Sequence, residues 1–186
     1  MPFLEAIFVC ASSGNPMKRV AEIRAIAGQG LEGDRYALGT GYYSPRDTED
    51  SADEMPDWSV ARASSRPRDW GGCQLTLIEG EALDRMRELH GIRIEHGEHR
   101  RNLVTRGLAL RELAGHRLRI GEVLLEYERP RPPCGYVERI TQKGMTKALG
   151  VGAGICVRVV TSGILREGAV IEVLPPGDGH VSRRLP

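Results

Sequence analysis

Aromatic residues are scarce in this sequence, and neither sign of charge is in clear excess. Phe, Trp and Tyr make up 5% of the 186 residues, so aliphatic side chains must fill the core, and the formal net charge is +1. Such a chain is not expected to bind nucleic acid, which attracts a concentrated basic surface. A local basic pocket for one anionic ligand is compatible with this charge. No apolar run is long enough for a transmembrane helix, so no membrane association is expected. The length suits one well-cored domain over residues 1–186.

The common catalytic and metal-binding motifs are absent as well. The sequence has no HExxH, GxSxG, P-loop or Rossmann fingerprint, which removes the usual support for hydrolase and nucleotide-binding functions. Four cysteines occur without a Cys-x-x-Cys pair, against zinc-ribbon and thioredoxin patterns. A cytoplasmic location with reduced thiols is therefore expected. Cys10 and Cys156 are expected to be small core residues, whereas the sequence does not place Cys73. We expect His96 and His99 to lie in a solvated polar loop rather than to bind a metal.

Short runs of apolar residues predict strands, and one longer run predicts a helix. The helix is expected over residues 79–90, where apolar side chains recur at three- and four-residue spacings and Gly91 ends the run. The expected strands cover residues 3–10, 20–26, 74–78, 102–105, 116–127, 155–161 and 169–174, and weaker helical spacing covers 135–147. The run 116–127 is expected to be two strands or one long bent strand, with Gly121 at the turn or bulge. Many short strands with one or two inserted helices predict a mainly β fold, either a barrel or a folded sheet.

Residues 44–70 interrupt this pattern. Ser, Asp, Glu, Pro and Arg dominate there, with Trp58 and Trp70 as exceptions. A segment of this composition buries too little apolar surface to offset the cost of ordering it, so we expect a mobile loop. Long loops of compact domains are often lids. Both a gate over a binding site and an insert without function are compatible with the sequence.

Cys134 has an unusual local sequence. Three prolines lie just before it, together with Arg129 and Arg131. Proline fixes φ and restricts the preceding residue, so this stretch is expected to be stiff and extended. Nearby positive charge favours the thiolate, which is the form that attacks electrophiles and ligates metals. The local chemistry fits a presented, reactive thiol about as well as a buried structural cysteine.

Residues 100–102 place two guanidinium groups and an amide just before an expected strand. Such groups can hold a phosphate or the edge of a heterocycle, although a charged strand entry is the common explanation. Together with Arg129, Arg131 and Cys134, they describe a pocket with anion-binding groups around one sulfur. We expect Arg101 to be exposed at the strand start, so that its replacement costs little stability.

Several segments, in their order along the chain, resemble the MOSC family, which is named for the C-terminal domain of molybdenum cofactor sulfurase. They are GLEGDRY at 30–36, QLTLIE at 74–79, RRNLVTRG at 100–107, LAGHRLRIG at 113–121 and PPC at 132–134. The resemblance implies a mainly β, MOSC-type β-barrel with a few short helices and a single important cysteine, here Cys134.

The resemblance also implies a function. Related domains bind a molybdenum-pterin cofactor, so Cys134 is expected to be the catalytic residue and the metal ligand. Arg101 and Asn102 are expected to hold the pterin phosphate, with Arg129 and Arg131 as further cofactor-binding groups. The expected activity is the reduction of N-hydroxylated or N-oxide compounds with electrons from a separate electron-transfer protein. Two alternatives stay open, namely a non-catalytic carrier of sulfur or molybdenum cofactor, supplied by a cysteine desulfurase, and a cofactor-free small-molecule-binding barrel.

Overall fold

The computed structural model describes residues 1–41 and 73–176. The loop expected over residues 44–70 lies outside the described residues, so its mobility and any gating role remain predictions. No helix in the described part of the chain is long and apolar enough to cross a membrane.

The described residues form a mainly β fold, as predicted. An eight-stranded sheet has the order β11-β7-β8-β9-β5-β6-β1-β2, and a three-stranded sheet has the order β10-β3-β4. The strands are β1 (Phe3–Val9), β2 (Lys18–Val20), β3 (Glu22–Ile26), β4 (Gly30–Leu31), β5 (Leu75–Glu79), β6 (Leu103–Arg106), β7 (Arg117–Ile120), β8 (Val123–Pro130), β9 (Ile155–Thr161), β10 (Gly163–Arg166) and β11 (Ile171–Leu174). Neighbouring strands are antiparallel except β5 and β6, which are parallel.

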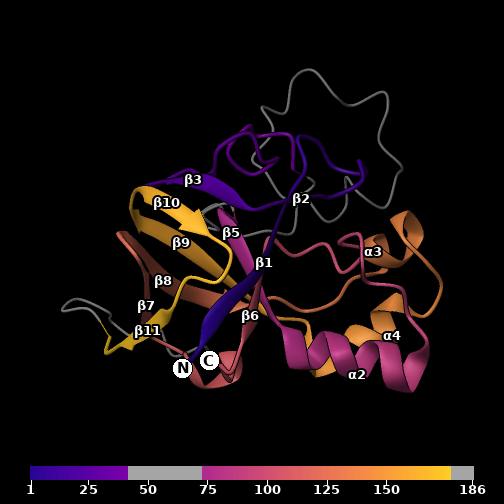
Figure 1. The fold of residues 1–186 in the computed structure, drawn as a ribbon. Helices are drawn as coiled ribbons and strands as arrows, with labels where there is room; N and C mark the ends of the chain where they lie inside the picture. The colour runs from indigo at the N-terminus through magenta and orange to yellow at the C-terminus, as the bar shows by residue number, and fades with distance from the viewer. Residues whose placement is uncertain (42–72, 177–186) are drawn as a thin grey trace, which may run out of the picture.

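The large sheet curls into a half-barrel, which brings β11, at one end of the strand order, close to the start of β1, next to the other end (Figure 1). Near one end, Leu4 of β1 donates its backbone N–H to Ala169 O at 2.9 Å. Ile171 of β11, the strand at the other end, donates to Pro2 O, also at 2.9 Å. These bonds satisfy backbone groups that an open sheet would leave at its edge.

Three short α-helices cover one outer face of this sheet (Figure 1). They are α2 (Gly80–His90), α3 (Gly135–Ile140) and α4 (Met145–Leu149), with the 3₁₀ turns η1 (Leu110–Glu112) and η2 (Gly150–Gly152). Helix α2 confirms the predicted helix, and it ends at Gly91, whose φ of 60° is a left-handed conformation that glycine adopts without strain. The weak helical pattern over 135–147 corresponds to two short helices.

Two apolar cores lie on opposite faces of the shared strands. Leu4 and Ile7 of β1 face the core inside the curled sheet, whereas Ala6 and Phe8 face the core under the helices. Leu4 and Ile7 share a face despite their odd spacing because the register with β6 shifts between Leu4 and Ala6. Such a bulge inserts one residue and turns the following side chains over.

One strand prediction is wrong, and one strand was not predicted. The strand predicted over 20–26 is interrupted at Ala21, so that β2 joins the large sheet and β3 joins the small one. Strand β10 was not predicted, because it is only four residues long and lies between the predicted turns at 162–163 and 167–168. The run 116–127, predicted as two strands or one bent strand, forms β7 and β8 around Gly121, whose φ is 58°.

Candidate functional site

The backbone around Cys134 is fixed by strands and helices on both sides. Strand β8 continues to Pro130, which pairs with Ile155, and the N–H of Arg131 donates to Gly154 O at 2.8 Å. Cys134 is extended, with φ −140° and ψ 155°, directly before α3. Its carbonyl accepts the N–H of Val137 at 3.1 Å and the hydroxyl of Thr146 at 3.3 Å. The stiff, extended presentation expected from the prolines is therefore present, and the residue is half-buried.

Cys134 lines a hollow whose wall is rich in arginine. We call this hollow the arginine pocket, and its lining residues are Ser13, Arg35, Tyr36, Arg100, Arg101, Arg131, Cys134, Tyr136, Val137 and Ile140. Among these described residues there is no Asp or Glu. The free space is about 30 Å³, which is the room of about one water molecule. The hydroxyl oxygen of Ser13 is buried and finds no hydrogen-bond partner in the described part of the chain, so a polar group in the pocket would satisfy it.

One buried carboxylate organises the pocket from behind. Asp34 is fully buried, and its Oδ2 accepts hydrogen bonds from the N–H of Cys10 at 3.1 Å, the amide of Asn102 at 3.0 Å and the guanidinium of Arg35 at 3.2 Å. Its Oδ1 accepts the N–H of Tyr36 at 3.1 Å. The side chain of Asp34 thus joins the glycine-rich turn to the end of β1 and the start of β6. Asp34 was not identified as a functional residue from the sequence.

Arg100 holds a strained backbone conformation at the pocket wall. Its φ is 61°, and among the described residues no other non-glycine residue has positive φ. This conformation costs about 1–3 kcal/mol and persists where surrounding contacts determine it. One such contact is the bond of its guanidinium to Cys10 Sγ at 3.4 Å, and another is its bond to Asn15 O. Burial lowers the pKa of Arg100, and the nearby charge of Arg35 acts in the same direction.

Arg101 is buried, which corrects the expectation that it is exposed. Its side chain is almost wholly covered, at 3% exposure, and donates to Ala153 O at 2.6 Å and to His99 O at 3.2 Å. Burial, together with the nearby charge of Arg131, lowers its pKa to about 10. The group therefore remains a cation at neutral pH, and two neighbouring guanidinium groups favour an anion between them.

The other two predicted cofactor-binding residues do not line the pocket. Asn102 is fully buried, and its carboxamide is used inside the protein, since Oδ1 accepts from Thr76 and Nδ2 donates to Phe8 O and Asp34. Arg129 lies on β8 opposite Cys156. The structure thus brings together Arg101, Arg131 and Cys134, and it gives Asn102 the contacts of a residue that positions them.

His99 is buried rather than solvated, which is a second correction. Its ring packs edge-on against Phe8 at a centroid distance of 5.1 Å, and Nδ1 accepts the N–H of Arg101 at 3.1 Å. Burial lowers its pKa to about 3, helped by the charges of Arg101 and Arg100, so the ring is neutral. The polar residues on both sides of His99 in the sequence predicted a surface loop. No signal in the sequence distinguished His99 from the exposed His96.

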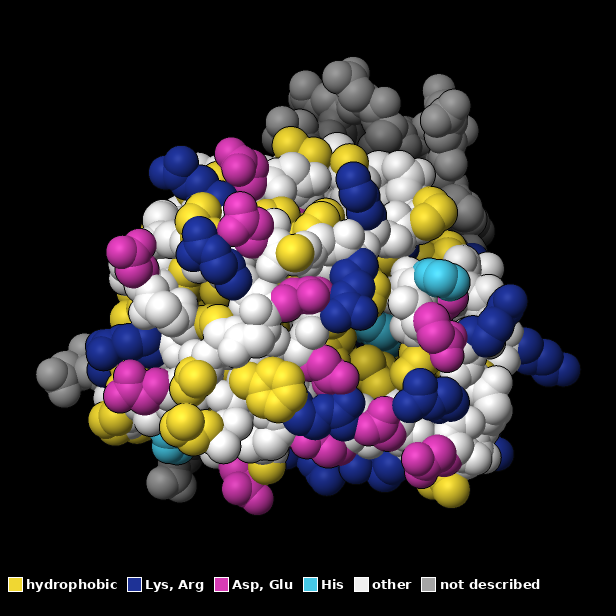
Figure 2. All heavy atoms as spheres, viewed as in Figure 1, with side chains coloured by type: hydrophobic (Ala, Val, Ile, Leu, Met, Phe, Trp, Pro, Cys, Tyr) yellow, Lys and Arg dark blue, Asp and Glu magenta, His cyan; other side chains and the backbone are white. Residues whose placement is uncertain are grey.

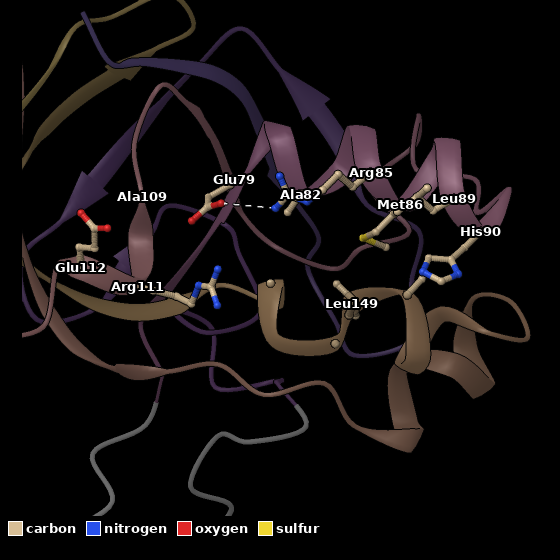
Figure 3. A pocket seen from close by; sticks show the side chains of 13 residues that line it. Glu79, Ala82, Arg85, Met86, Leu89, His90, Ala109, Arg111, Glu112 and Leu149 are labelled. Carbon is tan, nitrogen blue, oxygen red and sulfur yellow. Dashed lines mark ion pairs between the residues drawn. The ribbon is translucent and has the colours of Figure 1, made fainter.

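A larger hollow lies away from Cys134, between α2, η1 and the α4–η2 segment (Figure 3). We call it the helical hollow; it has about 710 Å³ of free space. Its walls carry both signs of charge, including Arg85, Glu79 and Glu112, and Glu79 pairs with Arg85 at 3.8 Å. The same mixture of acidic and basic side chains covers the face of the molecule seen in Figure 2. The arginine pocket differs from both, because every Asp, Glu, Lys or Arg in its lining is an arginine.

The family model of the MOSC domain matches residues 68–172, which is more than half of the chain. The chain belongs to the MOSC family. This family is linked to molybdenum-cofactor binding, which gives the protein a molybdenum-cofactor-related role at that general level. A search of curated proteins found no significant match.

Solved structures agree with the MOSC assignment. The YuaD protein from Bacillus subtilis superposes with a TM-score of 0.71 at 18% identity, over 95% of this chain and 98% of that one. YiiM from Geobacillus stearothermophilus gives 0.62 at 16% identity, over 96% and 78%. YiiM from Escherichia coli gives 0.56 at 18% identity, over 95% and 71%. At these identities the similarity establishes the fold.

The residues of the arginine pocket fit a molybdenum-pterin cofactor in their chemistry. Arginines bind phosphate through paired N–H groups, and a soft thiolate is a suitable ligand for the metal. Within residues 1–41 and 73–176, no group of three or more His, Cys, Asp or Glu side chains could hold a metal ion. A pterin-sized ligand also needs the lining side chains to move outward, because the free space is small.

Proposed function

We propose that the arginine pocket binds the anionic part of a molybdenum-pterin cofactor and that Cys134, as its thiolate, ligates the metal. The observation that carries this proposal is the convergence of four arginines and the Cys134 thiol on one pocket without a carboxylate in its lining. Membership of the MOSC family supports it. Arg131 and Arg100 hold the anion, and the buried Arg101 adds a fixed positive charge behind them.

The proposed reaction is the reduction of an N-hydroxylated or N-oxide substrate with electrons from a separate electron-transfer protein. When bound, the cofactor supplies two-electron and oxygen-atom chemistry. The chain supplies position and charge. Its guanidinium groups hold the anionic ligand, and the Asp34 network holds Arg35 and Tyr36 in place. These contacts fix part of the positive charge before a ligand binds, although the lining side chains must still move outward to admit a pterin.

A sulfur carrier is the second candidate, favoured by the size of the pocket. Free space of about 30 Å³ beside Cys134 accommodates one added sulfur atom more readily than a pterin. A cysteine desulfurase carrying a persulfide would transfer its outer sulfur to the Cys134 thiolate. The donor cysteine leaves as a thiolate and Cys134 becomes a persulfide, so no external oxidant is needed. The surrounding arginines stabilise the persulfide anion.

One preparation tests these alternatives together. The full chain is produced in a host with ample molybdate, and molybdenum, pterin and cyanide-labile sulfur are measured per chain. Bound molybdenum and pterin, with turnover of an N-hydroxylated substrate by an artificial electron donor, support the reductase. Labile sulfur on Cys134 without molybdenum supports the carrier. The absence of all three would contradict both proposals and favour the cofactor-free barrel.

A further inference from the structure

Two buried cysteines lie in contact beside the arginine pocket. Cys73 precedes β5, and Cys156 lies on the adjacent strand β9, opposite Thr76. Their sulfur atoms are 3.3 Å apart, and the exposed fractions of the two residues are 4% and 0%. The charge of Cys156 acts on Arg101 and Tyr36, two residues of the arginine pocket, so the cysteine pair lies within electrostatic reach of that pocket.

A hydrogen bond between the two sulfurs makes Cys156 the more acidic cysteine of the pair. Cys73 donates its proton in a hydrogen bond to Cys156 Sγ, and this bond lowers the pKa of Cys156. Burial opposes the shift, whereas the charges of Arg131 and Arg129 support it. The same hydrogen bond raises the pKa of Cys73, which therefore keeps its proton. Arg129, which does not line the pocket, thus faces a specific partner.

We propose that Cys73 and Cys156 form a reversible disulfide when the protein meets a peroxide. The Cys156 thiolate attacks one peroxide oxygen, the O–O bond breaks, and Cys156 becomes a sulfenic acid while hydroxide leaves. Cys73 then attacks the Cys156 sulfur, and its proton and the departing hydroxyl form water. Overall, two thiols lose two electrons to peroxide, which becomes two water molecules. The sulfurs approach by a little over 1 Å to reach the usual S–S length of about 2.05 Å.

Oxidation changes the charge beside the arginine pocket. The thiolate of Cys156 is lost, so Arg101 and Arg131 no longer have that negative charge near them. The oxidised protein should therefore bind an anion in the pocket more tightly than the reduced protein. The disulfide is inferred from the sulfur contact, and the effect on anion binding also depends on the lowered pKa of Cys156. Both hold whether or not a molybdenum cofactor is bound.

Peptide mapping tests the disulfide on the full chain. The reduced protein is treated with a small excess of hydrogen peroxide, residual thiols are alkylated in urea, and the digest is mapped without reduction. The expected product is a Cys73–Cys156 linked peptide, while Cys10 stays alkylated. Cys73→Ser keeps a hydrogen-bond donor but removes the second sulfur, so Cys156 should stop at a sulfenic acid that dimedone traps. Cys73→Ala removes the donor as well and should slow that trapping.

Three results would overturn the proposal. Linkage of Cys134 to Cys73 or Cys156 in place of the expected peptide would show that the contact is not the reacting pair. Full alkylation of Cys73 and Cys156 after peroxide would show that they do not react. The coupling to the arginine pocket is tested by calorimetry of phosphate binding at low salt and above pH 7. The Kd for phosphate should be several-fold lower in the oxidised protein than in the reduced protein. An unchanged Kd would contradict the coupling to the arginine pocket.

Discussion

The two hollows of this protein differ in a way that volume does not capture. The helical hollow is far larger, at about 710 Å³ against about 30 Å³, but acidic and basic side chains share its walls. The arginine pocket has four arginines and a thiol, and the buried Asp34 behind it accepts four hydrogen bonds, one of them from Arg35. Charge of one sign gathered on a pocket wall indicates ligand binding better than empty space does.

The largest difference should appear when the buried carboxylate is neutralised. Asp34→Asn leaves Arg35 buried without its anion, and breaking a buried ion pair costs about 3–5 kcal/mol. The matched change in the helical hollow is Glu112→Gln, at an exposed residue. We expect the urea midpoint to fall strongly for Asp34→Asn and to stay unchanged for Glu112→Gln. Equal midpoints for the two variants would show that Asp34 does not organise the pocket.

The second largest difference between the two hollows should be in their affinity for anions. Arg131→Met removes a charge from the arginine pocket, whereas Arg111→Met removes one from the helical hollow. A hydrogen bond to a charged group contributes about 1.5–3 kcal/mol, so phosphate or molybdate affinity should fall roughly tenfold or more in Arg131→Met only. Calorimetry at a fixed low salt concentration measures the affinity of each variant for the anion. A larger loss in Arg111→Met would place anion binding in the helical hollow. Arg101 suits this test less well, because it is buried and its replacement would change the stability of the fold as well as anion binding.

Acid sensitivity should come from the buried histidine. The pKa of His99 is about 3 in the fold and about 6.5 in the unfolded chain, so below pH 6.5 the unfolded state takes up a proton that the native state does not. Stability should fall as the pH drops from 6.5 towards 3, by up to about 1.4 kcal/mol per pH unit.

Variants of two histidines test whether His99 causes this pH dependence of stability. His99→Gln should flatten the pH dependence of urea unfolding, whereas His90→Gln, at an exposed residue of the helical hollow, should leave it unchanged. The same slope in wild type and His99→Gln would contradict the assignment to His99.

The smallest effect concerns the order in which thiols react. Cys134 is half-buried, whereas the other three cysteines are buried. Brief alkylation at neutral pH, followed by peptide mapping, should therefore label Cys134 first. If Cys10 or Cys156 reacts first, Cys134 is not the presented thiol of the arginine pocket.

Local patterns in the sequence predicted most helices and strands, but they could not predict the buried polar network around Asp34. Apolar spacing and Gly91 defined α2, and prolines defined the extended approach to Cys134. The roles of Arg101 and His99 depend on which long-range partners bury them, and spacing along the chain carries no such information. Asn102 lies just before β6, as its place in the sequence predicted, but its burial and its contact with Asp34 arise only from the three-dimensional arrangement.

Cysteine placement shows the same limit. The proline-rich sequence identified Cys134, and burial of Cys156 was predicted correctly. The sulfur contact between Cys73 and Cys156 joins residues far apart in sequence, so no motif marks it. Residues 44–70 were expected to be mobile, and because they lie outside the described residues that expectation is untested.

Molybdenum content measured on matched variants tests the proposed role of the arginine pocket most directly. Wild type, Cys134→Ser, Arg131→Met and Arg111→Met are produced with ample molybdate, confirmed as folded by their thermal transitions, and analysed for metal per chain. We predict molybdenum in wild type and in Arg111→Met, a large loss in Cys134→Ser, and a partial loss in Arg131→Met. Equal molybdenum in all four proteins would contradict binding in the arginine pocket.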